Sequence, residues 1–329
     1  MPSLETLPVE ILQTIFLYSL EINLPRASLS IARVLSSPLI YTWLIRLAFS
    51  SDNESSRHGI FTPDFLPPPL EFFSLSRSQR RDLQAALLEC RWCTLPLMRQ
   101  CQRDYIEHVL RRKTGDLALS LDPAALQSSL DDGFSRLSDA AHGHRGKGDL
   151  VVASRTRADD GSASAERKVA VWFHFGAVQI REPSDVFYER DLFRLPCCNT
   201  EFPARLPDKL LRSPWTPTQL EFLDLLAGDA WLDEDPSFPR ARQTLRNVVR
   251  LRNHAAFTRL LEMHVRTVPY RYSVPWPVHQ STVIAVLKHA DTHDDPFVAY
   301  LVHKKWNELP DMNSRIKEGL LAKARPAYL

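Results

Sequence analysis

"LPVEILQTIFLYSL", residues 7–20, decides the fold expected for the N-terminal part of this chain. At about 100° per residue, its large apolar side chains cover about 200° of a helix circumference. A helix on the surface of a globular domain needs an apolar stripe only a little wider than about 100°. The side chains that form this wide face are Ile11, Leu12, Ile15, Phe16, Tyr18 and Leu20. Either the rest of this chain or another protein must cover the remainder.

Three short helices are expected at the N-terminus. Pro8 suits a first helical turn, because its φ is fixed and its missing N–H is not needed there. This helix runs to about Leu20, and "NLPR" at 23–26 and "SSP" at 36–38 separate two further helices near 27–34 and 39–49. Helices of this size cannot enclose so many apolar groups among themselves. Such an exposed patch marks a partner site, and docking on the rest of this chain is the alternative.

Residues 4–49 resemble an F-box. The match is carried by Leu7-Pro8, Glu10-Ile11-Leu12, Ile15-Phe16 and Leu20. The second half departs from the family pattern, since "ARVLSSPLIYTW" replaces the usual basic-aromatic segment. In that family a three-helix module inserts its apolar face into a Skp-family adaptor, which links it to a cullin-based ubiquitin ligase. The resemblance implies an adaptor contact made by Leu7, Pro8, Ile11, Leu12, Ile15, Phe16, Leu20, Leu24 and Pro25.

The stretch 51–81 is rich in Pro and Ser and lacks a sustained amphipathic period, so it is interpreted as a linker. We therefore expect a fragment starting near Arg81 to be soluble and to melt cooperatively. Aggregation of that fragment would instead indicate that the first helix packs on its own chain. The remainder, 82–329, is expected to be a mostly helical client-binding domain, with a mobile or disordered loop over 142–168, the part richest in Gly and Ser.

Within this domain the strong β-formers on either side of Gly176 predict a hairpin over 168–182. Helical spacing appears at 82–113, with a break at Pro96. Further helices are expected at 217–228, 238–252, 254–266, 279–290, 295–306 and 313–324. They suggest stacked units without a fixed repeat period. The block from "FGAVQIREPSDVFYERDLFRLP" to "PDKLLRSPWT" weakly resembles uncharacterised F-box proteins of filamentous fungi, which adds no chemistry.

Composition narrows the function class. The chain has 329 residues, 41 basic and 39 acidic, so its formal net charge of +2 gives no reason to expect nucleic acid or an anionic membrane as partner. Five cysteines are too few for a disulfide scaffold. No run approaches the roughly 18 apolar residues of a membrane span. The N-terminus carries acidic residues and no Lys or Arg before Arg26, unlike a secretory signal. An intracellular protein, cytoplasmic or nuclear, is expected.

Two clusters contain residues that could bind a metal. Cys90 and Cys93 form a C-x₂-C and Cys197 and Cys198 are adjacent, but zinc sites usually repeat the two- to four-residue gap. "HADTHDD" at 289–295 lies between two expected helices, where an Asp before Pro296 suits a helix N-terminus. His142 and His144 fall in the expected loop, and G-x-S-x-G, Walker and dinucleotide motifs are absent. No catalytic residue, cofactor or metal is therefore predicted.

"RARQTLRNVVRLR" places Arg242, Arg246 and Arg250 on one helical stripe. Arginine clusters bind phosphate or carboxylate bidentately, so this stripe could contact an acidic or phosphorylated client. A solvated helix face is the alternative interpretation. The nearby connection "PYRYSVPW" could add flat apolar contacts. The possible client-binding residues are Arg242, Arg246, Arg250, Tyr270, Tyr272 and Trp276.

The sequence thus predicts a mainly α protein, with a three-helix N-terminal F-box over 1–50 followed by an irregular helical domain with a small β-hairpin. By resemblance it is a non-catalytic adaptor that recruits a client protein to an SCF-type ubiquitin ligase. Two alternatives belong to other classes. The F-box could serve a scaffold outside ubiquitination, or the 289–295 cluster could form a metal-dependent enzyme site.

Overall fold

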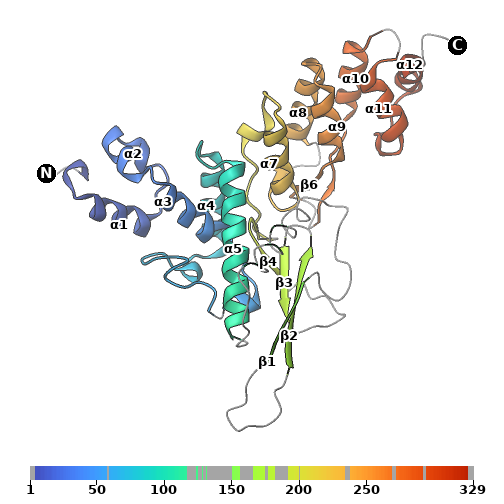
Figure 1. Cartoon of the computed structure of the whole chain (residues 1–329). Coiled ribbons are helices and arrows are strands. Elements are labelled where there is room, and N and C mark those ends of the chain that lie inside the picture. The colour runs from blue at the N-terminus through green and yellow to red at the C-terminus, as the bar shows by residue number, and fades with distance from the viewer. Residues whose placement is uncertain are drawn as a thin grey trace. The chain divides into compact units, whose positions relative to one another are not determined.

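The computed structural model describes residues 4–57, 59–116, 124, 128, 131, 150–155, 166–174, 177–181, 192–199, 201–233, 238–268, 272–291 and 294–324. The chain forms two compact units, Met1–Cys197 and Cys198–Leu329 (Figure 1). It is mainly helical, as the sequence predicts. The units divide at Cys197/Cys198, whereas the sequence interpretation places its boundaries at residues 50 and 81.

The first unit begins with the three expected helices: α1 (Val9–Ser19), α2 (Leu29–Leu35) and α3 (Pro38–Phe49). Pro8 directly precedes α1, and Leu20 ends it in a left-handed conformation with φ of 49°. A 3-10 turn at Leu24–Arg26 follows, and Ser28 caps α2 by accepting from the N–H groups of Ser30 and Ile31. Local signals therefore placed each helix to within a few residues.

Helices α4 (Arg77–Glu89) and α5 (Leu95–Asp116) pack against α3. Buried Gln84 donates to the carbonyl of Ala48 at 2.7 Å. Arg46 pairs with Asp104 at 2.9 Å across α3 and α5. Pro96 lies in the first turn of α5, so the break that it predicts falls just before it, at residues 90–94. These contacts join the N-terminal helices to the helices that follow.

The stretch 51–81 is not the extended linker that its composition suggests. It contains 3-10 turns at Glu54–Arg57 and Phe72–Ser74, and it belongs to the first compact unit. Its prolines alternate with large apolar side chains, and these side chains pack against the helices. The buried ones are Ile60, Phe65, Leu66, Leu70 and Phe72. Proline restricts the backbone here without preventing the side chains between prolines from entering the core.

His108 of α5 illustrates this packing. Its ring stacks on Phe65 with centroids 4.6 Å apart, and its Nε2 lies 2.6 Å from the carbonyl oxygen of Ile60. Burial is the largest effect and lowers the pKa of His108. The Ile60 carbonyl raises it, the positive charges of Arg112 and Arg46 lower it, Asp64 raises it, and the net shift is downward. Because the folded pKa lies below the ordinary value of about 6.5, protonation favours the unfolded chain.

We therefore expect the stability of the first unit to fall as the pH drops below about 6.5 toward the lower folded pKa of His108. His108→Gln keeps a donor for the Ile60 carbonyl and removes the titration. Its melting temperature should change less between about pH 7.5 and pH 5.5 than that of the parent. An equal change in both proteins would assign the pH dependence to other groups.

A four-stranded antiparallel sheet completes the first unit, in the order β1 (Leu150–Arg155), β2 (Glu166–His174), β3 (Ala177–Arg181) and β4 (Leu192–Arg194). The expected hairpin over 168–182 is confirmed as β2–β3, with two more strands beside it. The loop expected over 142–168 is wrong where it contains β1 and the start of β2, and the rest of that loop lies outside the described residues. β3 and β4 pack on α5.

The second unit contains the six expected helices: α7 (Pro217–Ala227), α8 (Pro239–Arg250), α9 (His254–Glu262), α10 (Gln280–His289), α11 (Pro296–Lys304) and α12 (Ser314–Ala324). A 3-10 helix at Asp208–Leu211 precedes α7. The sequence interpretation missed a small sheet of β5 (Trp231–Asp233), β6 (His264–Thr267) and β7 (Val274–Pro275). Strands of two to four residues are too short to show a period of two.

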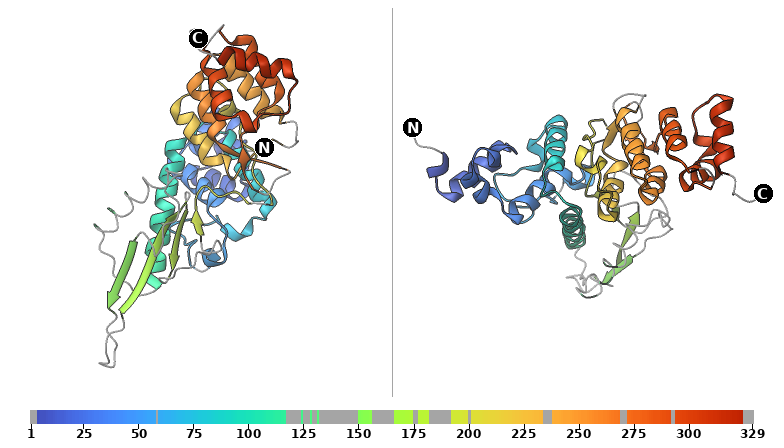
Figure 2. Two further views of the ribbon diagram at one scale, coloured as in Figure 1. Left: turned by 90° about the vertical axis from the view of Figure 1, so that its right-hand side faces the viewer. Right: turned by 90° about the horizontal axis from the view of Figure 1, so that it is seen from above.

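Helices α8–α9 and α10–α11 form two stacked pairs in this unit (Figures 1 and 2). α8 packs on α10, α9 packs on α11, and α12 covers α10 and α11. Leu245, Val248, Phe257, Val283 and Phe297 lie in the buried interior between them. The stacking leaves the outer side of α8 exposed, and the Arg stripe lies on that side.

Candidate interaction surfaces

The first helix has two apolar faces with different environments. Leu12, Phe16 and Leu17 are buried within the first unit, so this chain itself covers one part of the wide apolar surface of the helix. The other apolar side chains of α1 remain exposed, and Leu29 on α2 is exposed as well. Their exposed fractions are 46% for Val9, 48% for Ile11, 36% for Ile15, 74% for Tyr18 and 78% for Leu29. Ile11, Ile15 and Tyr18 lie within about 60° of one another around α1. Together with the exposed Leu29 of α2 we call them the α1–α2 apolar face, whereas Val9 lies more than about 100° away from all three around the helix.

The structure divides the nine residues expected to contact an adaptor. Ile11 and Ile15 lie on the α1–α2 apolar face, and Pro8 is exposed beside it. The expectation that Leu12 and Phe16 contact an adaptor is wrong, because both side chains are buried in the core of this chain. The remaining four are only half-buried: Leu7, Leu20, Leu24 and Pro25. Residues with the same chemistry that the prediction omits are Val9, Tyr18 and Leu29.

A half-open cavity of about 430 Å³ lies in the first unit near these helices. Phe16 and Pro25 line it together with Leu35. One wall is formed by Tyr41 and Trp92, whose rings stack with centroids 4.1 Å apart and planes 4° from parallel. Two of the expected adaptor-contact residues therefore face this cavity between elements of their own unit.

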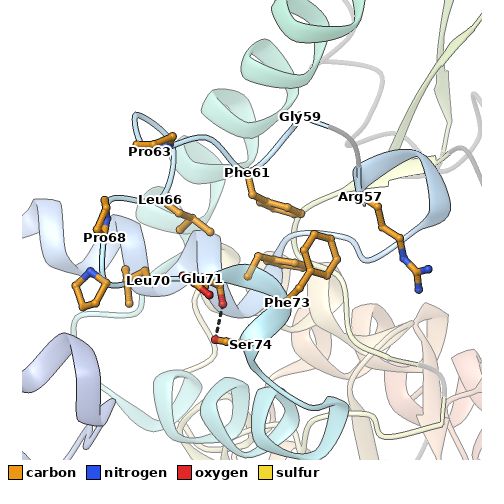
Figure 3. A pocket seen from close by; sticks show the side chains of 12 residues that line it. Arg57, Gly59, Phe61, Pro63, Leu66, Pro68, Leu70, Glu71, Phe73 and Ser74 are labelled. Carbon is orange, nitrogen blue, oxygen red and sulfur yellow. Dashed lines mark hydrogen bonds between the residues drawn. The ribbon is translucent and has the colours of Figure 1, made fainter.

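A second open cavity of about 550 Å³ lies within the stretch 51–81 (Figure 3). Phe61 stacks on Phe72 with centroids 3.7 Å apart, and Phe73 meets both rings edge-on. Pro63, Pro68 and Pro69 line it too, and Ser74 donates to the Glu71 carbonyl at 2.7 Å beside it. The lining offers flat apolar contacts, and its polar side chains are Arg57, Glu71 and Ser74.

The Arg stripe lies on the exposed side of α8. Arg246 and Arg250 are exposed and Arg242 is half-buried, whereas Leu245 and Val248 on the opposite side are fully buried. The aromatic connection expected to add client contacts beside the stripe is only partly exposed. Trp276 is only 1% exposed and belongs to the core, so the expectation that it contacts a client is wrong. Tyr272 is 69% exposed, and Tyr270 lies outside the described residues.

The 289–295 cluster serves a structural role at Asp295. Its side chain caps α11 by accepting from the N–H groups of Phe297 and Val298 at 3.0 and 3.2 Å. Its other oxygen accepts from Arg252 at 2.7 Å and from the Asp291 N–H at 3.1 Å. Burial acts to raise the pKa of Asp295, but these donors outweigh it and the pKa is lowered. The expected helix-capping role is confirmed.

The five cysteines are free thiols that are wholly or partly buried. Cys93, Cys101 and Cys198 are buried, and Cys90 and Cys197 are half-buried. Burial raises the pKa of Cys101 to about 12, which keeps this thiol protonated. Among the described residues, no three His, Cys, Asp or Glu side chains are gathered as a metal site requires. His142, His144 and His293 lie outside the described residues.

Within the described ranges, no helix combines the length and apolar character needed to span a bilayer. Comparison with protein-family models, with curated proteins and with solved structures finds no match for this chain.

Proposed function

We propose that this protein is a non-catalytic substrate-recognition adaptor, which binds a Skp-family adaptor through its N-terminal helices and recruits a client protein to an SCF-type ubiquitin ligase. The observation that carries the proposal is the α1–α2 apolar face. Ile11, Ile15, Tyr18 and Leu29 stay exposed although the same helices have already buried their core side chains. Together with the F-box resemblance of residues 4–49, this face supports a protein partner at the N-terminus.

The free energy available from covering the α1–α2 apolar face supports a specific contact with a protein partner. Burying an aliphatic or aromatic side chain of this kind contributes about 1.5–3 kcal/mol relative to leaving it in water. Contiguous apolar patches on soluble proteins mark interaction sites. Helix α1 is held in position from its other side by Leu12 and Phe16, and Gln13 donates to the Val34 carbonyl of α2 at 3.3 Å. The exposed face is thus presented on a supported helix.

The test is co-purification of the full chain with a Skp-family adaptor and a cullin. Ile11→Glu combined with Ile15→Glu places charges on the α1–α2 apolar face, and we expect adaptor binding to weaken by about 100-fold or more. Ile284→Glu is a matched control, since Ile284 is also helical and also 48% exposed, but lies in the second unit. It should bind the adaptor like the parent.

A Leu12→Ala variant distinguishes loss of stability from loss of the adaptor contact. Because Leu12 is buried at 2% exposure, its truncation should lower the melting temperature, at a cost of about 2–5 kcal/mol. The Ile11/Ile15 double variant should keep the parent's melting temperature. Full adaptor binding by that double variant would overturn the proposal. Adaptor binding without recruitment of a cullin would favour a scaffold acting outside ubiquitination.

A further inference from the structure

Three arginines of α8 form a regular array of positive charge. Arg242, Arg246 and Arg250 are four residues apart, which spaces them by about 6 Å along the helix axis. The opposite side of α8 is buried. The stripe is therefore held by a helix whose position is fixed by packing.

The neighbouring arginines are engaged, whereas the stripe is not. Arg240 pairs with Asp208 at 2.9 Å and donates to the Leu232 carbonyl at 2.6 Å. Arg252 is held by Asp295. Among the described residues, Arg242, Arg246 and Arg250 have no ion-pair partner, and α8 itself contains no acidic residue. The stripe thus keeps its charge available for another molecule.

A role in stabilising the helix does not account for this array. Like charges four residues apart on a helix repel each other. Positive charge in the first turn, where Arg242 lies, also opposes the helix dipole. Only Arg250, in the last turn, is favoured by that dipole. The neighbouring helix α10 packs on α8 and carries the exposed side chains Ile284 and Lys288.

We propose that the Arg stripe binds an extended acidic segment of another protein, with carboxylate or phosphate groups at alternate positions. Alternate residues of an extended chain are about 6.6 Å apart and point to the same side, which is close to the rise of about 6 Å between successive arginines of the stripe along the axis of α8. Each guanidinium binds a carboxylate or phosphate bidentately. The inference goes beyond the proposed ligase function and holds whether or not the first unit binds an adaptor.

A nucleic acid fits this surface less well. Interfaces with DNA bury large areas and are far more positive than three charges on one helix. The formal net charge of the whole chain is only +2. A protein segment with a short run of alternating acidic groups needs no wider basic surface.

The experiment uses the purified full chain without any adaptor. Fluorescence anisotropy measures binding of three peptides, alternating Glu-Ser, alternating phosphoserine-Ala and alternating Lys-Ser, and of a double-stranded DNA. We expect both acidic peptides to bind and the Lys-Ser peptide not to bind. Binding should weaken when salt is raised from about 50 to about 500 mM, because exposed charges are screened. The ratio of the dissociation constants of the Glu-Ser and phosphoserine-Ala peptides distinguishes carboxylate from phosphate recognition.

Arg246→Glu should weaken binding of the acidic peptides by about tenfold or more, and by more than Arg246→Ala, because repulsion is added to lost attraction. Its melting temperature should not fall, since the side chain of Arg246 is exposed and the new carboxylate would lie four residues from both Arg242 and Arg250. Arg315→Glu is a matched control on α12, at an exposed arginine of the same unit, and should bind like the parent.

Equal losses in Arg246→Glu and Arg315→Glu would show unspecific attraction and overturn the proposal. Absence of acidic-peptide binding to the parent at low salt would overturn it too. Tighter binding of the DNA than of both acidic peptides would assign the stripe to nucleic acid instead. These outcomes are independent of the adaptor pull-down, so failure of one proposal leaves the other standing.

Discussion

A fragment that starts at residue 82 should be insoluble, or should lack protected amides in α4 and α5. This expectation reverses the one drawn from composition, which treats 51–81 as a separable linker. In the folded chain the side chains of Leu87, Leu88, Met98, Tyr105 and Val109 are completely buried. Removing α3 and the stretch 51–81, which includes the N-cap Ser76 and the start of α4, would expose much of this surface, at about 1.5–3 kcal/mol for each large side chain. The sum approaches or exceeds the total stability of a typical domain, about 5–15 kcal/mol.

Polar contacts would be lost with the apolar ones. The buried side chain of Gln84 would lose its acceptor at Ala48, and Tyr105 would lose Ser51, whose hydroxyl lies 3.0 Å from its own. Burial raises the pKa of Tyr105, so this hydroxyl is neutral and depends on such a partner. Each hydrogen bond lost in this way removes about 0.5–1.5 kcal/mol of stabilisation.

Solubility and hydrogen exchange check this prediction. A fragment comprising 198–329 is the matched control, because it starts at the boundary between the two compact units. It should be soluble and keep protected amides in α8 to α11. Adding residues 1–81 back to the 82–329 fragment should restore protection in α4 and α5. A soluble 82–329 fragment with protection in both helices would show that the N-terminal helices are dispensable for the fold.

Asp295→Ala should strongly destabilise the second unit. The carboxylate is completely buried and has four donors: Arg252 and the N–H groups of Asp291, Phe297 and Val298. Removing it uncaps α11 and leaves Arg252 without its closest partner. Loss of the cap costs about 0.5–2 kcal/mol. Loss of the charge-assisted hydrogen bond to Arg252, whose side chain is 34% exposed, costs about 1.5–3 kcal/mol more.

Asp291→Ala offers a matched control, because Asp291 also faces Arg252 but is 80% exposed and 3.5 Å away. Exposed pairs contribute about 0–1 kcal/mol, so this variant should be nearly as stable as the parent. Hydrogen exchange in α11 and the denaturant midpoint measure both effects. Equal behaviour of the two variants would show that the buried carboxylate does not hold this end of α11.

The pH dependence gives a further check on Asp295. Its folded pKa is lowered, so its stabilisation is fully present above the unfolded value of about 3.9 and is lost as the pH falls through the folded value. Asp295→Asn cannot ionise. The difference in unfolding free energy between the parent and this variant should therefore shrink as the pH is lowered from about 5 toward 3.

The sequence by itself determined the positions of the helices. Pro8 and Asp295 mark helix starts through local chemistry, since a cap or a fixed φ acts within one turn. The β2–β3 hairpin was equally predictable, because its two strands are separated in the sequence only by residues 175–176 and both are rich in β-formers. The alternation of arginine and aliphatic residues in α8 likewise predicted its exposed and buried sides.

Only the tertiary structure decided which apolar side chains remain free. Leu12 and Ile11 are neighbours in sequence and equally apolar, yet one is 2% and the other 48% exposed. The same holds for Trp276, which is buried although its surroundings resemble an open connection, and for Phe65, which packs on His108 more than forty residues away. Burial depends on contacts with distant segments, and neither periodicity nor composition encodes those partners.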